Sequence, residues 1–292
     1  MDLIQKLKKD NSYYLIDSGG FQKLELIGDH LIVRPSPQAV WFPYHDSELW
    51  DQKEAWFIRK ETGGGDWHFK GSSVRKERVI TYHHFVWKVK YTPFGHIGLF
   101  GEHLPQMKWV EQQITTAGFQ MEILNLFAYT GLATLTASRA GAKVCHLDAA
   151  KGIVDWAREN AVLSGMKTRP IRWIVDDVFH FIKHEVKRGK NYDAIILDPP
   201  SFGRGPRKEL WKIEDHLVDL LSYLRQLMSA RFQFLLLSSH TACYSPFALK
   251  NLLENFCPEN GVLEYDEMLI PQTGSVRSLP SGAFARWSRK NN

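Results

Sequence analysis

Apolar and polar residues follow two different patterns along the chain. In the first 90 residues, short β-prone runs such as 23–27 and 30–33 are separated by glycine-containing turns, which predicts strands and hairpins. From residue 102 onward, apolar positions recur at helical spacing and then alternate with short apolar runs typical of buried strands. This alternation predicts a parallel sheet with crossover helices. We therefore expect an α/β domain at residues 102–292, preceded by a smaller β-rich domain at residues 1–101.

Three apolar runs of the second domain, ending near residues 126, 148 and 198, are each followed by a carboxylate or a turn that contains glycine, where a strand should lead into a helix. Ligands of an open α/β sheet bind outside the carboxyl ends of the strands, so these endings should border one crevice. Such a crevice suits a cofactor that carries a nucleoside. The strands and helices that we expect here are 121–127, 133–140, 143–147, 151–163, 171–175, 178–186, 192–197, 217–228, 232–238, 247–256, 262–269 and 282–287.

The turn after the first of these strands reads Asn125-Leu-Phe-Ala-Tyr-Thr-Gly131 and leads into a helix. Gly131 permits close approach of backbone and ligand, and the N–H groups at a helix start favour a negatively charged group. A dinucleotide site would require G-x-G-x-x-G, but only one glycine is present, and Phe127 and Tyr129 occupy the space of a pyrophosphate. The turn therefore suits the carboxylate of a methionine moiety, and a packed turn without a ligand is the alternative.

Aspartates end the second and third strands. Asp148 follows Gly131 by 17 positions, where an acidic side chain can accept the hydroxyl groups of a ribose. Capping of the helix that follows is the alternative role for Asp148. Of the pair Asp176 and Asp177, we favour Asp177 as the acceptor for an adenine amino group, and the other aspartate would then cap the next helix.

The fourth strand ends in Asp198-Pro199-Pro200-Ser201. Proline fixes φ and has no N–H, so two in succession hold the backbone rigid. Their carbonyl groups can accept hydrogen bonds from an amino group on a planar base. We therefore assign these four residues to the catalytic site, and a rigid turn without a catalytic role is the alternative.

Together with Leu147-Asp-Ala149 and Ala157-Arg-Glu-Asn160, these motifs resemble class I S-adenosylmethionine-dependent methyltransferases over residues 90–245. The resemblance is to the large-subunit ribosomal RNA group that includes the cytosine-5 enzyme of 23S rRNA. It implies S-adenosyl-L-methionine as cofactor and a Rossmann-like seven-stranded sheet with an antiparallel last strand. The segment 92–102 resembles the loop that covers the cofactor. The cofactor contacts expected on this basis are Asn125, Phe127, Ala128, Tyr129, Thr130, Gly131, Asp148, Asp176, Asp177, Asp198, Phe100 and Glu102.

The methyl acceptor is less well indicated. Cytosine-5 members of the group carry a nucleophilic cysteine just after the fifth strand, whereas this strand ends in Leu237-Ser-Ser-His-Thr241 and Cys243 follows two residues later. We therefore expect methylation of a base nitrogen in RNA, most simply ribosomal RNA, rather than of carbon 5. A protein or small-molecule acceptor, a nicotinamide-dependent oxidoreductase and an RNA-binding module without activity are the alternatives.

Composition adds only a little to this interpretation. The net charge of +5 would help docking on phosphates but is also common in ordinary enzymes. Three unpaired cysteines, the charged N-terminus and the absence of a long apolar run lead us to expect a cytoplasmic protein without membrane association. His180 and His184 have metal-like spacing, but the apolar face of their helix lies opposite, so we expect no metal. The oligomeric state is left open. The tryptophans of the β-rich domain are expected in its core, with base stacking as the alternative.

Overall fold

The computed structural model describes residues 3–61, 63–71 and 76–290. The chain forms two compact units, which we describe separately. The first unit comprises Met1–Glu102 and Leu269–Ser281, and the second comprises His103–Met268 and Gly282–Asn292. Our sequence boundary at residues 101 and 102 therefore lies next to the observed one. Residues 269–281 differ, because the Gln272 segment bridges to β1, where Thr273 N donates to the Leu15 carbonyl at 2.8 Å.

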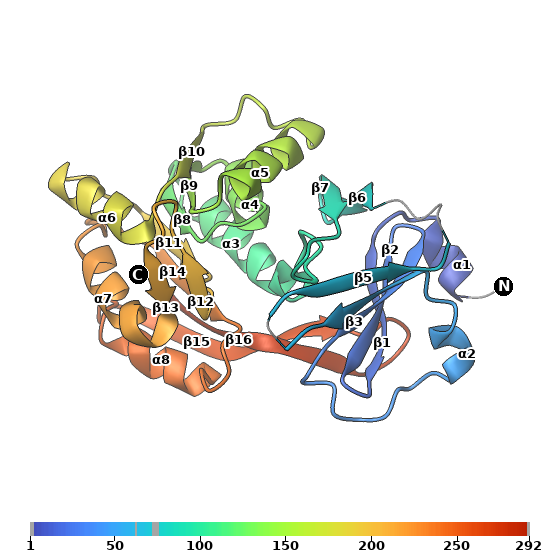
Figure 1. Cartoon of the computed structure of the whole chain (residues 1–292). Coiled ribbons are helices and arrows are strands. Elements are labelled where there is room, and N and C mark those ends of the chain that lie inside the picture. Colours follow the sequence, from blue (N-terminus) through green and yellow to red (C-terminus); the bar gives the residue numbers. More distant parts are fainter. Residues whose placement is uncertain (1–2, 62, 72–75, 291–292) are drawn as a thin grey trace. The chain divides into compact units, whose positions relative to one another are not determined.

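The first unit is built on a five-stranded sheet with the order β1-β2-β3-β4-β5 (Figure 1). Only the β3–β4 pair is parallel among these neighbours. A separate hairpin, β6–β7, follows in the chain. The elements are α1 (Leu3–Lys8), β1 (Tyr13–Gly19), β2 (Gln22–Ile27), β3 (His30–Pro35), α2 (Ser47–Trp50), β4 (Ala55–Arg59), β5 (Gly65–Phe69), β6 (Glu77–Tyr82), β7 (Phe85–Lys90) and the 3-10 helix η1 (Gly101–His103), which ends at the first residue of the second unit.

A buried ion pair lies within this sheet. Arg34 Nε lies 2.6 Å from Glu25 Oε2, and the Tyr13 hydroxyl donates to Glu25 Oε1 at 2.8 Å. Burial alone would raise the pKa of Glu25, but Arg34 and Lys23 outweigh this effect and lower it to about 2. The carboxylate is therefore ionised and fully paired inside the first unit, as a buried charge must be.

The second unit contains a seven-stranded sheet with the order β10-β9-β8-β11-β14-β16-β15. Strands β10, β9, β8, β11 and β14 are parallel to their neighbours, whereas β16 runs antiparallel to β14. This arrangement confirms the fold that we expected, including the antiparallel last strand. The strands are β8 (Glu122–Leu126), β9 (Lys143–Asp148), β10 (Ile171–Val175), β11 (Ala194–Leu197), β14 (Phe234–Ser239), β15 (Gly261–Pro271) and β16 (Ser278–Arg289).

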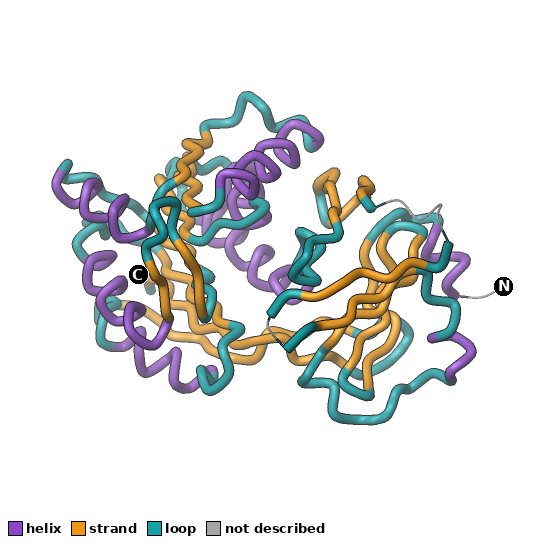
Figure 2. The backbone as a smooth tube through the Cα atoms, viewed as in Figure 1, coloured by secondary structure: helices purple, strands orange, loops and turns teal. Residues whose placement is uncertain are grey.

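Helices cover both faces of this sheet (Figures 1 and 2). On one face, apolar residues of α3 such as Val110 pack against β8 and β14. On the other face, residues of α6, α7 and α8 such as Phe181 and Leu220 form the larger core. The helices are α3 (Leu104–Thr116), α4 (Leu132–Arg139), α5 (Lys151–Leu163), α6 (Val178–Lys187), α7 (Ile213–Arg225) and α8 (Pro246–Glu254).

Several features, including helix α2, were not expected from the sequence. A small hairpin of β12 (Phe202–Arg204) and β13 (Leu210–Lys212) follows the Asp-Pro-Pro-Ser turn directly. The helix α1 precedes the first strand. Within the part of the chain that the structure describes, no helix has the length and apolar character needed to cross a bilayer.

Candidate active site

The turn between β8 and α4 has an unusual backbone. Phe127, Tyr129 and Gly131 have φ values of 53°, 49° and 98°, and the two residues between them are not among those with positive φ. Left-handed conformations in non-glycine residues cost about 1–3 kcal/mol each and persist only where the surroundings enforce them. Alternating φ signs turn successive N–H groups toward one side, which is a common way to bind an anion. In this turn, however, Ala128 N donates to the Leu147 carbonyl, Tyr129 N to Asp148 Oδ2 and Gly131 N to the Ala128 carbonyl, so the binding of a ligand carboxylate here stays a prediction.

Asp148, at the end of β9, holds this turn in place. Its Oδ2 accepts a hydrogen bond from Tyr129 N at 3.0 Å, and its Oδ1 accepts one from Ala150 N at 3.0 Å. Burial raises the pKa of Asp148, and the backbone N–H donors partly oppose that effect. The carboxylate therefore joins the first turn to the start of α5 and stays at the strand ends, where we expected a ribose contact.

Asn125 differs from our expectation. Its side chain is buried at 2% exposure and donates to Thr134 Oγ1 at 2.8 Å, which in turn lies 2.8 Å from His146 Nδ1. Burial lowers the pKa of His146 to about 3, so the imidazole is neutral. The Asn125 amide thus belongs to a polar network between β8, α4 and β9 rather than to the open end of the strands. The reason is the alternation of a strand, which places this residue on the face covered by α4.

Of the two aspartates after β10, the one that caps the next helix is not the one that we expected, whereas the adenine contact of Asp177 stays a prediction. Asp177 is the N-cap of α6, because its Oδ1 accepts from His180 N at 3.0 Å. Asp176 lies 2.6 Å from His180 Nδ1 and 3.4 Å from Arg207 Nη2. Capping thus falls to Asp177, the residue that we preferred for the adenine, and Asp176 pairs with His180 on the helix surface.

Asp198, at the end of β11, is surrounded by three polar side chains. Ser238 Oγ donates to Asp198 Oδ1 at 2.6 Å. His103 Nε2 lies 3.2 Å from Asp198 Oδ2, and His240 Nε2 lies 3.7 Å from Oδ1. Burial would raise the pKa of Asp198, but His103 and His240 outweigh it and hold that pKa well below its ordinary value. The group is therefore a carboxylate at neutral pH.

The rest of the Asp-Pro-Pro-Ser turn is tied to the β12–β13 hairpin. Trp211 Nε1 donates to the Pro200 carbonyl at 2.6 Å, and the Trp211 ring packs on Phe127 with centroids 4.9 Å apart. Ser201 Oγ lies 2.7 Å from Thr241 Oγ1 in the loop after β14. The Pro199 carbonyl, by contrast, accepts no hydrogen bond from the residues that the structure describes. The Pro200 carbonyl keeps a second lone pair, so both proline carbonyls can accept a bond from a ligand, and that of Pro199 has no donor among the described residues.

The structure brings most of the expected site residues to the strand ends of the second unit. Phe100 and Glu102 belong to the first unit, where the Phe100 ring meets His96 edge-on and Glu102 is buried. Cys243 is exposed in the loop after β14 with a φ of 72°. Its contribution to any chemistry remains a prediction.

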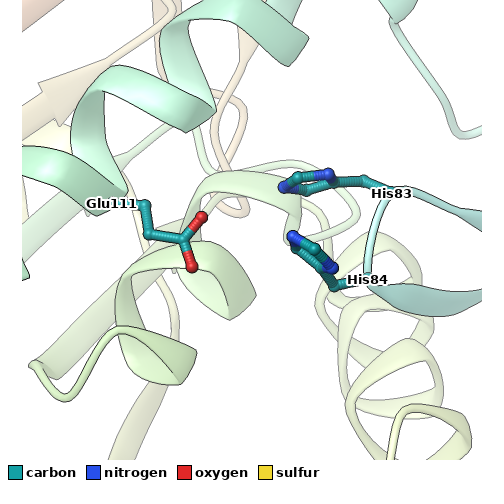
Figure 3. A group of neighbouring side chains, drawn as sticks. All are labelled: His83, His84 and Glu111. Carbon is teal, nitrogen blue, oxygen red and sulfur yellow. The ribbon is translucent and has the colours of Figure 1, made fainter.

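A histidine pair in the first unit is a further feature of interest. His83 and His84 form the two-residue turn between β6 and β7, and their ring centroids lie 3.7 Å apart (Figure 3). Figure 3 also draws Glu111, which belongs to α3 of the second unit, where it lies 3.3 Å from Arg139 Nη1. Two histidines from one unit fall short of the three or four protein ligands that zinc requires, so we assign no site to this turn.

Sequence reasoning missed His103, His240, Ser238 and Trp211. Ser238 and His240 had a usable signal, because they end the fifth strand of the parallel series, at the edge where the other candidates lie. His103 and Trp211 had none, because their partners are distant in the sequence.

Comparisons with known proteins agree with this geometry. The chain is 36% identical to a SAM-dependent methyltransferase from Agrobacterium tumefaciens, over 96% of this chain and 91% of that one, with a TM-score of 0.91. The structure of SMU.776, described as a methyltransferase complexed with SAH, covers 97% of this chain and 79% of its own, with a TM-score of 0.71 and 17% identity, which shows the shared fold alone.

Curated relatives match over part of their length. The ribosomal RNA large subunit methyltransferase K/L of Shewanella amazonensis is 30% identical over 58% of this chain and 23% of its own. The protein of that name from Pseudoalteromonas atlantica is 30% identical over 66% of this chain and 26% of its own. The match thus spans about a quarter of these relatives. Residues 82–246, more than half of the chain, match the family of S-adenosylmethionine-dependent methyltransferases. The chain therefore belongs to the S-adenosylmethionine-dependent methyltransferase family, with S-adenosylmethionine as its methyl donor.

Proposed function

We propose that this methyltransferase acts on a base of RNA, with ribosomal RNA as the first candidate. The observation that carries the proposal is the rigid Asp198-Pro199-Pro200-Ser201 turn, whose Pro199 carbonyl accepts no hydrogen bond from the residues that the structure describes. Pro199 is a buried residue, and its carbonyl, held on a rigid turn, would accept an amino group of a planar base that enters the site. The names of the relatives from Shewanella and Pseudoalteromonas support RNA, and the basic balance of the chain is compatible with it.

The cofactor would bind across the ends of β8, β9 and β10. We propose that the turn 127–131 binds the methionine carboxylate, although the N–H groups of Ala128, Tyr129 and Gly131 already donate to the Leu147 carbonyl, to Asp148 and to the Ala128 carbonyl. Asp148 would accept the ribose hydroxyls with the lone pairs that its two backbone contacts leave unused. The adenine amino group would then go to the Asp177 oxygen that does not cap α6.

The acceptor atom is proposed to be a nitrogen rather than carbon 5 of cytosine. Covalent chemistry at carbon 5 needs a positioned thiolate. The loop after β14 begins with His240 and Thr241, and Cys243 lies beyond them with an exposed side chain. Methyl transfer from a sulfonium to a nitrogen needs only alignment of acceptor, methyl carbon and sulfur. Because Ser238 and His103 contact Asp198, the Pro199 carbonyl is the better holder of the base.

The first unit is proposed to contribute to RNA recognition. Its tryptophans are mainly structural, since indole N–H groups such as that of Trp87 are bonded to backbone carbonyls inside the unit. Other aromatic side chains are available for stacking: Phe42 is 91% exposed, and the Arg277 guanidinium lies 5.4 Å from the ring centroid of Tyr44. Unpaired bases stack on such rings and on arginine planes.

The experiment is methyl transfer to deproteinised ribosomal RNA from cells that lack the gene, followed by mass spectrometry of the nucleosides. We expect one N-methylated nucleoside that is absent from those cells and appears after incubation with enzyme and S-adenosylmethionine. Cys243→Ala should retain the activity. Loss of activity in this variant would indicate that carbon 5 of cytosine is the acceptor. If no nucleoside changes in cells or in the reaction, the acceptor is a protein or a small molecule and the RNA proposal is wrong.

A further inference from the structure

Three side chains able to ligate a metal converge where β11 and β14 end. His103 Nε2 lies 3.2 Å from Asp198 Oδ2 and 3.4 Å from His240 Nε2, and His240 Nε2 lies 3.7 Å from Asp198 Oδ1. We propose that His103, Asp198 and His240 form a binding site for one divalent transition-metal ion. The sequence led us to expect no metal because only His180 and His184 had metal-like spacing, whereas His103, Asp198 and His240 are 95 and 42 positions apart and were not considered together.

The distances among the donor atoms match those of a metal site. Zinc binds imidazole nitrogen at about 2.0–2.1 Å and carboxylate oxygen at about 2.0–2.2 Å, so two ligands on a tetrahedral ion lie about 3.3 Å apart. The observed separations of 3.2, 3.4 and 3.7 Å lie close to this value. Three protein ligands leave the fourth corner of the tetrahedron for water or for an atom of the substrate.

The orientation of the two imidazoles also supports a metal site. Nε2 of His103 faces Nε2 of His240, and two N–H donors directed at each other would repel. At least one Nε2 therefore presents its lone pair, which is the form of histidine that ligates metals. His103 is also the N-cap residue of α3, yet its side chain makes no capping hydrogen bond to that helix.

A supporting partner fixes the carboxylate. Ser238, which is 3% exposed on β14, donates its hydroxyl to Asp198 Oδ1 at 2.6 Å. Hydrogen bonds of this kind orient ligating carboxylates in established metal sites. The hydrogen bond between Ser201 and Thr241 further ties the loops after β11 and β14 together.

The donor set defines the class of ion. Two imidazoles with one carboxylate suit zinc, iron, cobalt or nickel, whereas magnesium and calcium take oxygen ligands. The competing account has no metal: a proton on His103 or His240 would bind the cluster together through an ion pair with Asp198. The proposal concerns the site alone and holds whatever the methyl acceptor is.

The test is metal binding by the whole chain after treatment with a chelator and dialysis. Calorimetry with Zn²⁺ and visible absorption with Co²⁺ should each give one ion per chain, with the intense cobalt bands of a tetrahedral site, whereas Mg²⁺ should give no heat. Ser238→Ala should weaken Zn²⁺ binding about 10- to 100-fold, as loss of an outer partner does. His103→Ala and His240→Ala, which remove a ligand, should weaken it by at least about 100-fold.

A matched control is His184→Ala, which removes an exposed histidine of α6 from the same unit and should leave Zn²⁺ affinity unchanged. Thermal unfolding of each variant reports whether the fold is intact. The proposal is overturned if the wild-type chain binds neither Zn²⁺ nor Co²⁺ stoichiometrically. It is equally overturned if His184→Ala abolishes binding while His240→Ala and Ser238→Ala leave it intact, since the ion would then lie at the surface of α6.

Discussion

Replacing Asp148 with asparagine would test how the cofactor turn is held. The Asp148 carboxylate accepts one hydrogen bond from Tyr129 N on Oδ2 and one from Ala150 N on Oδ1, both at 3.0 Å. Asparagine has the same shape but only one oxygen, so one of the two N–H groups would face an NH₂ group. A hydrogen bond to a charged group contributes about 1.5–3 kcal/mol. We expect the turn to lose stabilisation of that size.

This loss should appear in cofactor affinity. The left-handed residues Phe127 and Tyr129 need support from their surroundings, and Asp148 supplies it through Tyr129. A penalty of about 1.5–3 kcal/mol corresponds to weaker binding of S-adenosylhomocysteine by about 10- to 150-fold. Calorimetry measures the affinity, and thermal unfolding shows whether the variant is folded. Asp148→Ala removes both acceptors and should bind more weakly still.

The matched control is Asp155→Asn, on the exposed face of α5, where the carboxylate pairs with Lys151 Nζ at 2.7 Å. Like Asp148→Asn, this substitution removes one negative charge near the start of α5. It should change the affinity for S-adenosylhomocysteine less than twofold, where a tenfold change corresponds to about 1.4 kcal/mol. If Asp148→Asn binds S-adenosylhomocysteine as tightly as the unmodified protein, the hydrogen bonds of the carboxylate do not support cofactor binding, and our account of the turn is wrong.

Three further outcomes are expected. Gly131→Ala should lower both thermal stability and cofactor affinity, because φ is 98° and an added Cβ would meet a neighbouring side chain at 3.2 Å; a left-handed non-glycine residue costs about 1–2 kcal/mol, measurable by urea unfolding. Acid should destabilise the first unit, because the pKa of Glu25 is lowered to about 2 in the folded chain. The stability that this gives is complete above the ordinary pKa of 4.5 and is lost as the pH falls toward 2, a transition that tryptophan fluorescence should show. Glu25→Gln leaves Arg34 without its carboxylate partner and should unfold the first unit even at neutral pH. Trp211→Phe keeps a ring but leaves the Pro200 carbonyl without its donor, so kcat should fall more than S-adenosylmethionine affinity; an unchanged kcat in a methylation assay would show that the hairpin does not position the turn.

Local patterns in the sequence were enough to determine the class of the fold and the edge where the site lies. Alternating strand and helix signals predict a parallel sheet, and the carboxyl ends of its strands are where ligands bind. Asp148 and Asp198 were identified because each directly follows an apolar run, and Gly131 because it ends the turn that leads from such a run into a helix. The family resemblance implied seven strands with an antiparallel last strand, which the structure confirms, and the structure adds the strand order and the pairing of β16 with β14.

Tertiary structure decided what each of these side chains contacts. Asn125 lies at a strand end in the sequence, but its amide is buried against Thr134, and Asp177 rather than Asp176 caps α6. The segment 269–281 belongs to the first unit, although the chain on both sides of it, including α8, belongs to the second unit. Strand alternation and capping geometry depend on register and backbone angles that composition does not specify.

The cluster of His103, Asp198 and His240 shows the same division most clearly. The sequence by itself places Asp198 and His240 directly after two apolar runs, because a strand end is a local property, but the pairing of these two strands is known from the structure. Only the folded chain brought His103, at the start of α3, within 3.2 Å of that carboxylate. Contacts between residues so far apart in sequence depend on how helices pack on the sheet, and that packing is set by the whole core rather than by any one segment.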